Sequence, residues 1–196
     1  MAEVPEGVEV KVDGKTVFVK GEKGELERTF SDARFNKSVD VRIEDKNFIA
    51  EGKIDDRKIK AFVGTIAAHV RNMILGVTKG FKCELAVVFT HFPMTFTVEP
   101  KKFLINNFIG EKGSRSAKII GNVEIKADKT KITITGINKE DVGQTASNIE
   151  HICGVGKKDR RTFQDGCFIV ASGVDDETFV NEFDNVAPVG QQKEGE

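Results

Sequence analysis

Apolar and polar residues alternate in short stretches along the first fifty residues of the chain. Valines at every second position from 8 to 12 are followed by Asp13-Gly14, a turn dipeptide that accepts positive φ, so a β-hairpin is predicted there. A second alternating stretch, 39–43, leads into a polar turn around Asp45-Lys46 and an apolar stretch at 48–50. These patterns predict antiparallel strands that bury one face.

A longer stretch, from about residue 55 to residue 75, has the spacing of a helix. Its apolar residues recur three, four and seven positions apart, which places them in one stripe, and Gly76 follows as the expected stop. The second half of the chain has the same order of elements. Its members are TFTV and FLINNF around Glu99-Pro100-Lys101, VEIKA and KITIT around Asp128-Lys129, and a helix that begins after Asn138 and ends at Gly154.

Three blocks of sequence occur twice in the same order, which indicates a tandem duplication. The first block contains Gly-Glu-Lys-Gly in both copies, at 21–24 and 110–113. The separation between matched blocks falls from 89 to 84 to 79 residues, because the first copy has two longer loops. The matched blocks are 19–30 with 108–119, 39–52 with 123–136, and 63–73 with 142–152.

Each copy therefore predicts a small antiparallel β-sheet domain closed by one α-helix, and the fold class is α+β with a tandem duplication. The expected domains are residues 1–82 and residues 83–175. Residues 176–196 are acidic and polar, and we expect a disordered tail there, with Phe179 and Phe183 docking locally.

The composition is that of an ordinary globular chain, with 39% hydrophobic and 31% charged residues. No apolar run approaches the roughly 20 residues of a membrane span, and the first ten residues lack the apolar segment of a secretory signal. Three cysteines are too few and too scattered for a disulfide framework. A reducing, cytoplasmic setting without a membrane is expected.

The formal net charge of −1 conceals an uneven distribution of charge along the chain. Residues 1–100 hold 16 basic and 16 acidic side chains, residues 101–162 hold 13 basic and 7 acidic ones, and residues 163–196 hold 1 basic and 8 acidic ones. The middle segment is the part that would attract a polyanion such as RNA.

The basic segment ends in KKDRRTFQDG, residues 157–166. The matching loop of the first copy, 76–81, has one lysine and no arginine, so the duplication contains its own control. The run is either a solvated turn or a phosphate-binding loop, in which ammonium groups and guanidinium forks contact the backbone of RNA. Its cations are Lys157, Lys158, Arg160 and Arg161.

Three residues of this stretch, Phe163, Asp165 and Gly166, are expected to anchor it to the fold, although Phe163 is also suited to stacking on a base. Further cations follow Gly-Glu-Lys-Gly in the second copy, where the first copy has glutamates, and others lie at a hairpin tip, where soluble proteins also place lysines. These additional candidates for phosphate contacts are Lys112, Arg115, Lys118, Lys101 and Lys102.

No catalytic or metal-binding motif stands out. His151, Cys153 and Cys167 lack the paired spacing of a zinc site, so we expect one core cysteine and one surface histidine. The segment 154–159 has no Ser or Thr after its lysine and leaves a helix rather than entering one, so it is not a nucleotide-binding P-loop. A KH-type loop joins two helices, whereas Gly-Glu-Lys-Gly follows a strand. We expect no enzyme, metal or cofactor.

The duplicated pattern resembles the family of the sixth protein of the large ribosomal subunit, in its archaeal and eukaryotic branch. The resemblance covers about residues 5–172 and depends on NNFIGEKGSRSAKI, 106–119, and KKDRRTFQDGCFIV, 157–170. Members of that family commonly have an aliphatic residue and a tyrosine after the glycine, where this chain has Cys167 and Phe168. We interpret this difference as a packing variation that leaves the RNA contacts intact.

The resemblance implies a non-enzymatic, rRNA-binding constituent of cytoplasmic ribosomes, located near the sarcin–ricin loop and the factor-binding region of the large subunit. It implies that the second domain makes the main rRNA contacts, at the cations named above, and that the partners are large-subunit rRNA, neighbouring ribosomal proteins and, transiently, translational GTPases. The neutral first domain is expected to brace the particle surface or neighbouring proteins. The alternatives are an RNA-binding adaptor outside the ribosome, a protein scaffold built on the acidic tail, and an enzyme of unknown type.

Overall fold

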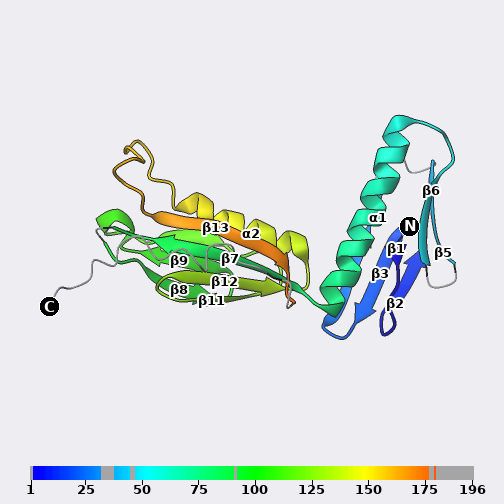
Figure 1. The fold of residues 1–196 in the computed structure, drawn as a ribbon, viewed down its shortest axis with the longest axis horizontal. Helices are drawn as coiled ribbons and strands as arrows, with labels where there is room; N and C mark the ends of the chain where they lie inside the picture. Colours follow the sequence, from blue (N-terminus) through cyan, green and yellow to red (C-terminus); the bar gives the residue numbers. More distant parts are fainter. Residues whose placement is uncertain (1, 32–37, 45–46, 91, 177–178, 180–196) are drawn as a thin grey trace. The chain divides into compact units, whose positions relative to one another are not determined.

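The computed structural model of the chain describes residues 2–31, 38–44, 47–90, 92–176 and 179. The predicted turn at Asp45-Lys46, and Phe183 with nearly all of the predicted tail, lie outside these residues. The chain forms two compact units, which are shown in Figure 1. The first contains the described residues up to Gly80 with Ile137–Lys139, and the second contains Phe81–Gly136 and the described residues from Glu140 onward.

The described residues of the first unit form two three-stranded antiparallel sheets and one helix. The predicted hairpin at Asp13-Gly14 is confirmed, and Gly14 has a φ of 59°. One sheet has the order β2-β3-β4 and the other has the order β1-β6-β5. The strands are β1 (Ala2–Glu3), β2 (Glu9–Asp13), β3 (Thr16–Gly21), β4 (Gly24–Thr29), β5 (Val39–Glu44) and β6 (Asn47–Gly52).

Helix α1 (Arg57–Thr78) closes the core of the first unit. The Asp56 side chain accepts a hydrogen bond from the Lys58 N–H at 3.2 Å and so caps the first turn. The predicted stop at Gly76 is wrong. The helix continues to Thr78 because Val77 still packs in the core, and the chain turns at Gly80, whose φ is 84°.

Within the described part of the chain, α1 is the one helix whose length and mean hydropathy of 1.2 would suit a bilayer. Its apolar stripe is buried, however, in a core that also contains Val17, Val19 and Phe48 from the sheets. The helix is therefore explained as the core helix of this unit.

The described residues of the second unit form a four-stranded sheet, a three-stranded sheet, one α-helix and a short 3₁₀ helix (Phe108–Gly110), and their strand pairs are all antiparallel. The sheet orders are β11-β12-β7-β13 and β10-β9-β8. The elements are β7 (Phe81–Val88), β8 (Thr95–Glu99), β9 (Lys102–Asn106), β10 (Arg115–Lys118), β11 (Val123–Ala127), β12 (Lys131–Gly136), α2 (Lys139–Ile152) and β13 (Gly166–Val174).

Helix α2 is fastened to the second unit by apolar packing and by side-chain hydrogen bonds. Val142, Ala146 and Ile149 are buried. The Thr145 hydroxyl accepts from the Ile120 N–H at 3.1 Å, and the Asn148 amide donates to the Lys118 carbonyl at 2.9 Å. These contacts hold α2 beside β10 and the segment that follows it. The predicted α+β class is confirmed.

The C-terminal end of the described chain packs on the second unit. The Lys82 ammonium lies 4.8 Å from the ring centroid of Phe179, and a Cβ added to Gly173 would lie 3.4 Å from the same ring. The predicted local docking of Phe179 is therefore confirmed.

Candidate nucleic-acid interface

Several loops of the second unit leave its four-stranded sheet at the same end. Val88, the last residue of β7, pairs with Gly166, the first residue of β13. The Val87 N–H donates to the Thr130 carbonyl at 2.9 Å, which brings the tip of the β11–β12 hairpin to the same place. Residues 89–90 and 92–94, the hairpin tip 128–130 and the loop 153–165 therefore share one end of the sheet, which we call the loop end.

Two of the predicted anchors, Asp165 and Gly166, fix the C-terminal end of the loop 153–165. The buried Asp165 carboxylate accepts from the Thr90 N–H at 2.8 Å and so ties the loop to the segment that follows β7. A Cβ on Gly166 would lie 2.9 Å from the ring of Phe168, so the ring takes the space that a side chain at 166 would need. These contacts explain why Asp165 precedes β13 and why the strand begins with Gly166.

The basic part of this loop is a hydrogen-bonded turn organised by Asp159. Its carbonyl accepts from the Thr162 N–H at 3.2 Å and from the Phe163 N–H at 2.9 Å, while its carboxylate accepts from the Arg161 N–H at 3.0 Å. An aspartate within a basic run thus shapes the turn. The four cations are exposed, and Lys157, Arg160 and Arg161 form no ion pair with another described residue. We call residues 157–163 the basic turn.

Phe163 is half-buried, and the Lys158 ammonium lies 4.9 Å from its ring centroid. This cation–π contact covers one face of the ring. Whether Phe163 serves as an anchor or as a stacking platform for a base stays a prediction.

The Gly-Glu-Lys-Gly segment has different structures in the two units. In the first unit Gly21 pairs with Gly24, and the segment is the tight turn of the β3–β4 hairpin. In the second unit it belongs to a longer connection, residues 107–114, between β9 and β10, which we call the Gly-Glu-Lys loop. Within it Ile109 has a φ of 51°, a left-handed conformation that β-branched residues rarely adopt.

The Gly-Glu-Lys loop contacts Phe92 and Pro93 at the loop end. The Asn107 amide donates to the Pro93 carbonyl at 3.1 Å. A Cβ on Gly110, whose φ is 73°, would lie 3.2 Å from the ring of Phe92. Phe108 is fully buried and anchors the Gly-Glu-Lys loop in the core of the unit. The exposed Lys112 thereby joins the cations of the basic turn on the same end of the unit.

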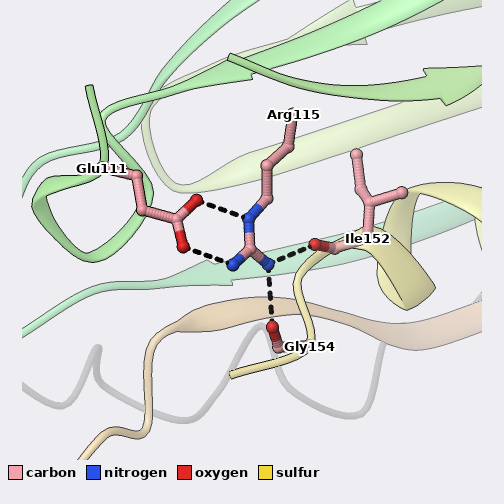
Figure 2. Close-up of polar contacts among 4 residues, drawn as sticks. All are labelled: Glu111, Arg115, Ile152 and Gly154. Carbon is pink, nitrogen blue, oxygen red and sulfur yellow. Dashed lines mark hydrogen bonds and ion pairs between the residues drawn. The ribbon is translucent and has the colours of Figure 1, made fainter. Parts of the chain in front are cut away.

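Arg115 links the Gly-Glu-Lys loop to the C-terminal end of α2, as Figure 2 shows. Its guanidinium donates to both carboxylate oxygens of Glu111, from Nε at 2.8 Å and from Nη2 at 2.6 Å. Nη1 donates to the carbonyls of Ile152 at 2.6 Å and Gly154 at 2.8 Å. The group was predicted to contact phosphate, and the structure instead surrounds it with acceptors from the protein.

The electrostatics of this pair favour its charged form. The pKa of the Glu111 carboxyl lies below its ordinary value, first because Arg115 donates to it and, to a smaller degree, because Arg115 and Lys158 are positively charged. A lowered pKa means that the pair stabilises the fold above the ordinary range of the carboxyl, and that this contribution is lost as the pH falls through the lowered value. The pair is intact near neutral pH.

The other predicted cations lie away from the loop end. Lys118 pairs with Lys102, and the Ile119 N–H donates to the Lys101 carbonyl at 3.1 Å. Arg115 occupies the opposite end of the same ladder, where it pairs with Ile105, and the three residue steps from Lys102 to Ile105 separate the two ends by roughly 10 Å. The predicted residues therefore form two groups. Lys101, Lys102 and Lys118 are the second group.

One cation at the loop end was missed from the sequence. Lys129 is exposed at the tip of the β11–β12 hairpin, beside the end of β7. The sequence pattern indicates only a turn at Asp128-Lys129. Its proximity to the basic turn depends on the pairing of β12 with β7, which are about fifty residues apart, so only a prediction of the strand order could have found it.

The cysteines and histidine give no metal site in the described part of the chain, where no group of three His, Cys, Asp or Glu residues is suited to hold a metal ion. The prediction of one core cysteine is wrong, because Cys153 and Cys167 are both buried. Cys153 begins the loop 153–165, and Cys167 lies just after its C-terminal end. Their thiols are hydrogen-bonded to each other, and this bond lowers the pKa of Cys153. His151 is exposed as predicted.

Comparison with known proteins identifies relatives of the whole duplicated region. The model of the ribosomal protein L6 family matches residues 4–80 and 92–166, one segment in each unit. The chain is 49% identical over 173 residues to large ribosomal subunit protein uL6 of Desulfurococcus amylolyticus, covering 87% of this chain and 92% of that protein.

Similar matches are found with other proteins of the same name. The uL6 proteins of Aeropyrum pernix and Methanocella arvoryzae are 47% and 45% identical to this chain, which covers 90% and 94% of their lengths. The matches span 85% and 86% of this chain. The resemblance found in the sequence motifs is confirmed, and the chain belongs to the ribosomal protein L6 family.

Proposed function

We propose that this protein is a structural, non-enzymatic constituent of the large ribosomal subunit in the cytoplasm, and that it binds rRNA through its second domain, residues 83–175. Relatives that it covers almost completely are named large ribosomal subunit proteins. Its binding site lies near the sarcin–ricin loop and the factor-binding region, where neighbouring large-subunit proteins are partners and translational GTPases pass close by. In this place it supports subunit assembly and translation.

The observation that carries the proposal is the exposure of unpaired cations on an internally fixed turn. Lys157, Arg160 and Arg161 form no ion pair with the described residues, while Asp159 and Asp165 hold the turn and its foot by hydrogen bonds. A cation that already has an acidic partner must lose it to bind phosphate. These cations have no such competitor, and Lys112 and Lys129 extend the same surface.

The mechanism is electrostatic scaffolding. Lysine and arginine side chains replace condensed counterions on the phosphates of rRNA, so affinity decreases as salt increases. Guanidinium forks on Arg160 and Arg161 add bidentate geometry to this attraction. Selectivity comes from the shape of folded rRNA, because the major groove of an A-form helix is too narrow for side chains to read.

The second group of cations, Lys101, Lys102 and Lys118, makes a separate rRNA contact in this proposal. The distance of roughly 10 Å along β9 suits contacts with separate phosphates of the folded rRNA. The first domain, residues 1–82, braces the surface of the particle or neighbouring proteins. Its matched loop offers Lys79 alone, and the Lys79 carbonyl accepts from the Lys23 side chain.

Sedimentation of the full chain with purified large subunits tests this function against the alternative, a free RNA-binding adaptor. A subunit constituent is expected to remain with the large-subunit peak after a high-salt wash, because many contacts hold it in the assembled particle. An adaptor held only by exposed cations is expected to leave, because each phosphate contact weakens as salt rises. Release of the protein at moderate salt, together with undiminished assembly of subunits without it, would overturn the proposal.

A further inference from the structure

We infer that Arg115 is a positioning residue for rRNA binding, and that with Glu111 it forms a clamp that sets where the basic turn presents its cations. The inference rests on the function proposed above, since it concerns how the second unit binds RNA. It changes the role of Arg115 from a direct phosphate contact to a link between the Gly-Glu-Lys loop and the basic turn.

The clamp occupies most of the hydrogen-bonding capacity of the guanidinium. Four of its five N–H groups are matched by the four acceptors of Glu111, Ile152 and Gly154 (Figure 2). The Arg115 Cζ atom also lies 4.3 Å from the ring centroid of the buried Phe108. Only 26% of its side chain is exposed, so little of the group is open to an RNA phosphate.

The acceptors at the helix end explain the choice of a cation. The last carbonyls of a helix have no partner within it and bear the negative end of its dipole. Ile152 is the last residue of α2, and Gly154 follows two residues later. Arg115 therefore satisfies groups that the fold leaves open, and it does so from the first position of β10, which is distant in the sequence.

A short chain of hydrogen bonds connects the clamp to the basic turn. Gly154, held by Arg115, precedes the buried Val155, whose carbonyl accepts from the Lys158 N–H at 3.3 Å. Asp159 comes next and organises the turn that carries Arg160 and Arg161. The position of Gly154 thus sets the start of the basic turn. The charge of Lys158 also reaches Glu111, where it helps to lower the carboxyl pKa.

The first unit contains a counterpart of this clamp. The Lys23 N–H donates to the Val77 carbonyl at 3.0 Å, and the Lys23 ammonium donates to the Lys79 carbonyl, just after α1 ends. A cation within or just after Gly-Glu-Lys-Gly, Lys23 in the first unit and Arg115 in the second, thus satisfies the helix end in both units. Leu26 occupies the position that aligns with Arg115, so the second copy performs the task with a different residue. The second copy also adds a carboxylate, which binds two of the guanidinium donors.

The acid in the clamp makes the inference sharply testable. Glu111 lies on the surface proposed to bind a polyanion, and 42% of its side chain is exposed. If Arg115 and Glu111 acted on RNA only through their charges, removing the glutamate would strengthen binding. If they position the basic turn, removing the glutamate will weaken binding although the protein becomes more positive.

The experiment measures the affinity of Glu111→Gln, Arg115→Lys and a control, Glu124→Gln, for protein-free large-subunit rRNA. Glu124 is exposed on β11 of the same unit and loses the same charge in the control. We expect Glu111→Gln to weaken binding about fivefold and to lower the dependence of affinity on salt, because a displaced turn releases fewer counterions. Arg115→Lys keeps the charge but loses the fork, so it is expected to weaken binding similarly. The control is expected to bind as tightly as the natural chain or slightly more tightly.

All variants are measured at a temperature at which circular dichroism shows them folded. Unchanged or stronger rRNA binding by Glu111→Gln would contradict the inference that the clamp positions the basic turn. Undiminished rRNA binding by Arg115→Lys would contradict it as well. Failure of the proposed function has a different signature, since rRNA binding would then survive the loss of Arg160 and Arg161 as well. The two outcomes are therefore distinguishable in one set of titrations.

Discussion

Replacing Arg160 and Arg161 together by alanine is expected to weaken binding of large-subunit rRNA about thirtyfold at moderate salt. Both side chains are exposed on a turn whose backbone is fixed by Asp159, and neither has an acidic partner among the described residues. Each charge-assisted contact with phosphate contributes about 1 kcal/mol after its exposure to solvent is considered. Log affinity falls linearly with log salt concentration, and the magnitude of this negative slope should become smaller by about 1.5.

A matched control removes two cations from the first unit. Lys20 and Lys79 are exposed, and Lys79 lies in the loop that aligns with the basic turn. Lys20→Ala with Lys79→Ala therefore changes the net charge equally, and we expect less than a twofold loss of affinity. Filter binding or fluorescence anisotropy of both variants over a series of salt concentrations measures the difference. Equal losses would mean that general charge, rather than the basic turn, determines binding.

Replacing Phe103 by alanine is expected to destabilise the second unit by about 3–5 kcal/mol. Phe103 is fully buried on β9 and stacks on Phe96 with ring centroids 5.6 Å apart. The Gly-Glu-Lys loop begins directly after this strand, so loosening β9 also loosens the clamp. Thermal unfolding followed by circular dichroism measures the loss of stability, and rRNA binding should disappear as the unit unfolds.

Phe48→Ala is the corresponding change in the first unit, where Phe48 is fully buried on β6. Its cost should be similar, about 3–5 kcal/mol, because a ring of the same volume leaves a well-packed core. We expect this variant to keep its affinity for free rRNA within about twofold, since the proposed contacts belong to the other unit. If both variants lost rRNA binding at the same temperature, the two units would not divide the work as we propose.

Much of the fold could be predicted from local patterns. Alternating valines and the turn at Asp13-Gly14 specify β2 and β3 because a strand with one buried face has a period of two. The apolar stripe specifies α1, but the end of the helix was placed too early. Gly76 is compatible with a helix stop and with a buried helical position, and only the packing of Val77 distinguishes them.

The candidate site was predicted less completely, because its arrangement depends on contacts between distant residues. The basic turn could be found from its charges and from the comparison with the first copy. The partners of Arg115 could not, since Ile152 and Gly154 are 37 and 39 residues away. An exposed arginine in a basic loop and an arginine that binds two helix-end carbonyls have the same local sequence.

The duplication is informative because it separates what the fold requires from what one copy has added. Both units use a cation of the Gly-Glu-Lys-Gly region to satisfy the end of the helix, so this feature belongs to the fold. The basic turn occurs in the second unit alone among the aligned loops, so the fold does not require it. We attribute this added charge to the binding of rRNA.

Site-directed photo-crosslinking in assembled large subunits tests the central claim most directly. A photoreactive residue at the exposed Thr162, next to Arg161, leaves all four cations of the basic turn in place, and one at Lys79 probes the matching loop of the first unit. Our account predicts abundant crosslinks from position 162 to large-subunit rRNA and few from position 79. Crosslinks from position 162 to proteins only, or abundant rRNA crosslinks from position 79 with few from position 162, would contradict it.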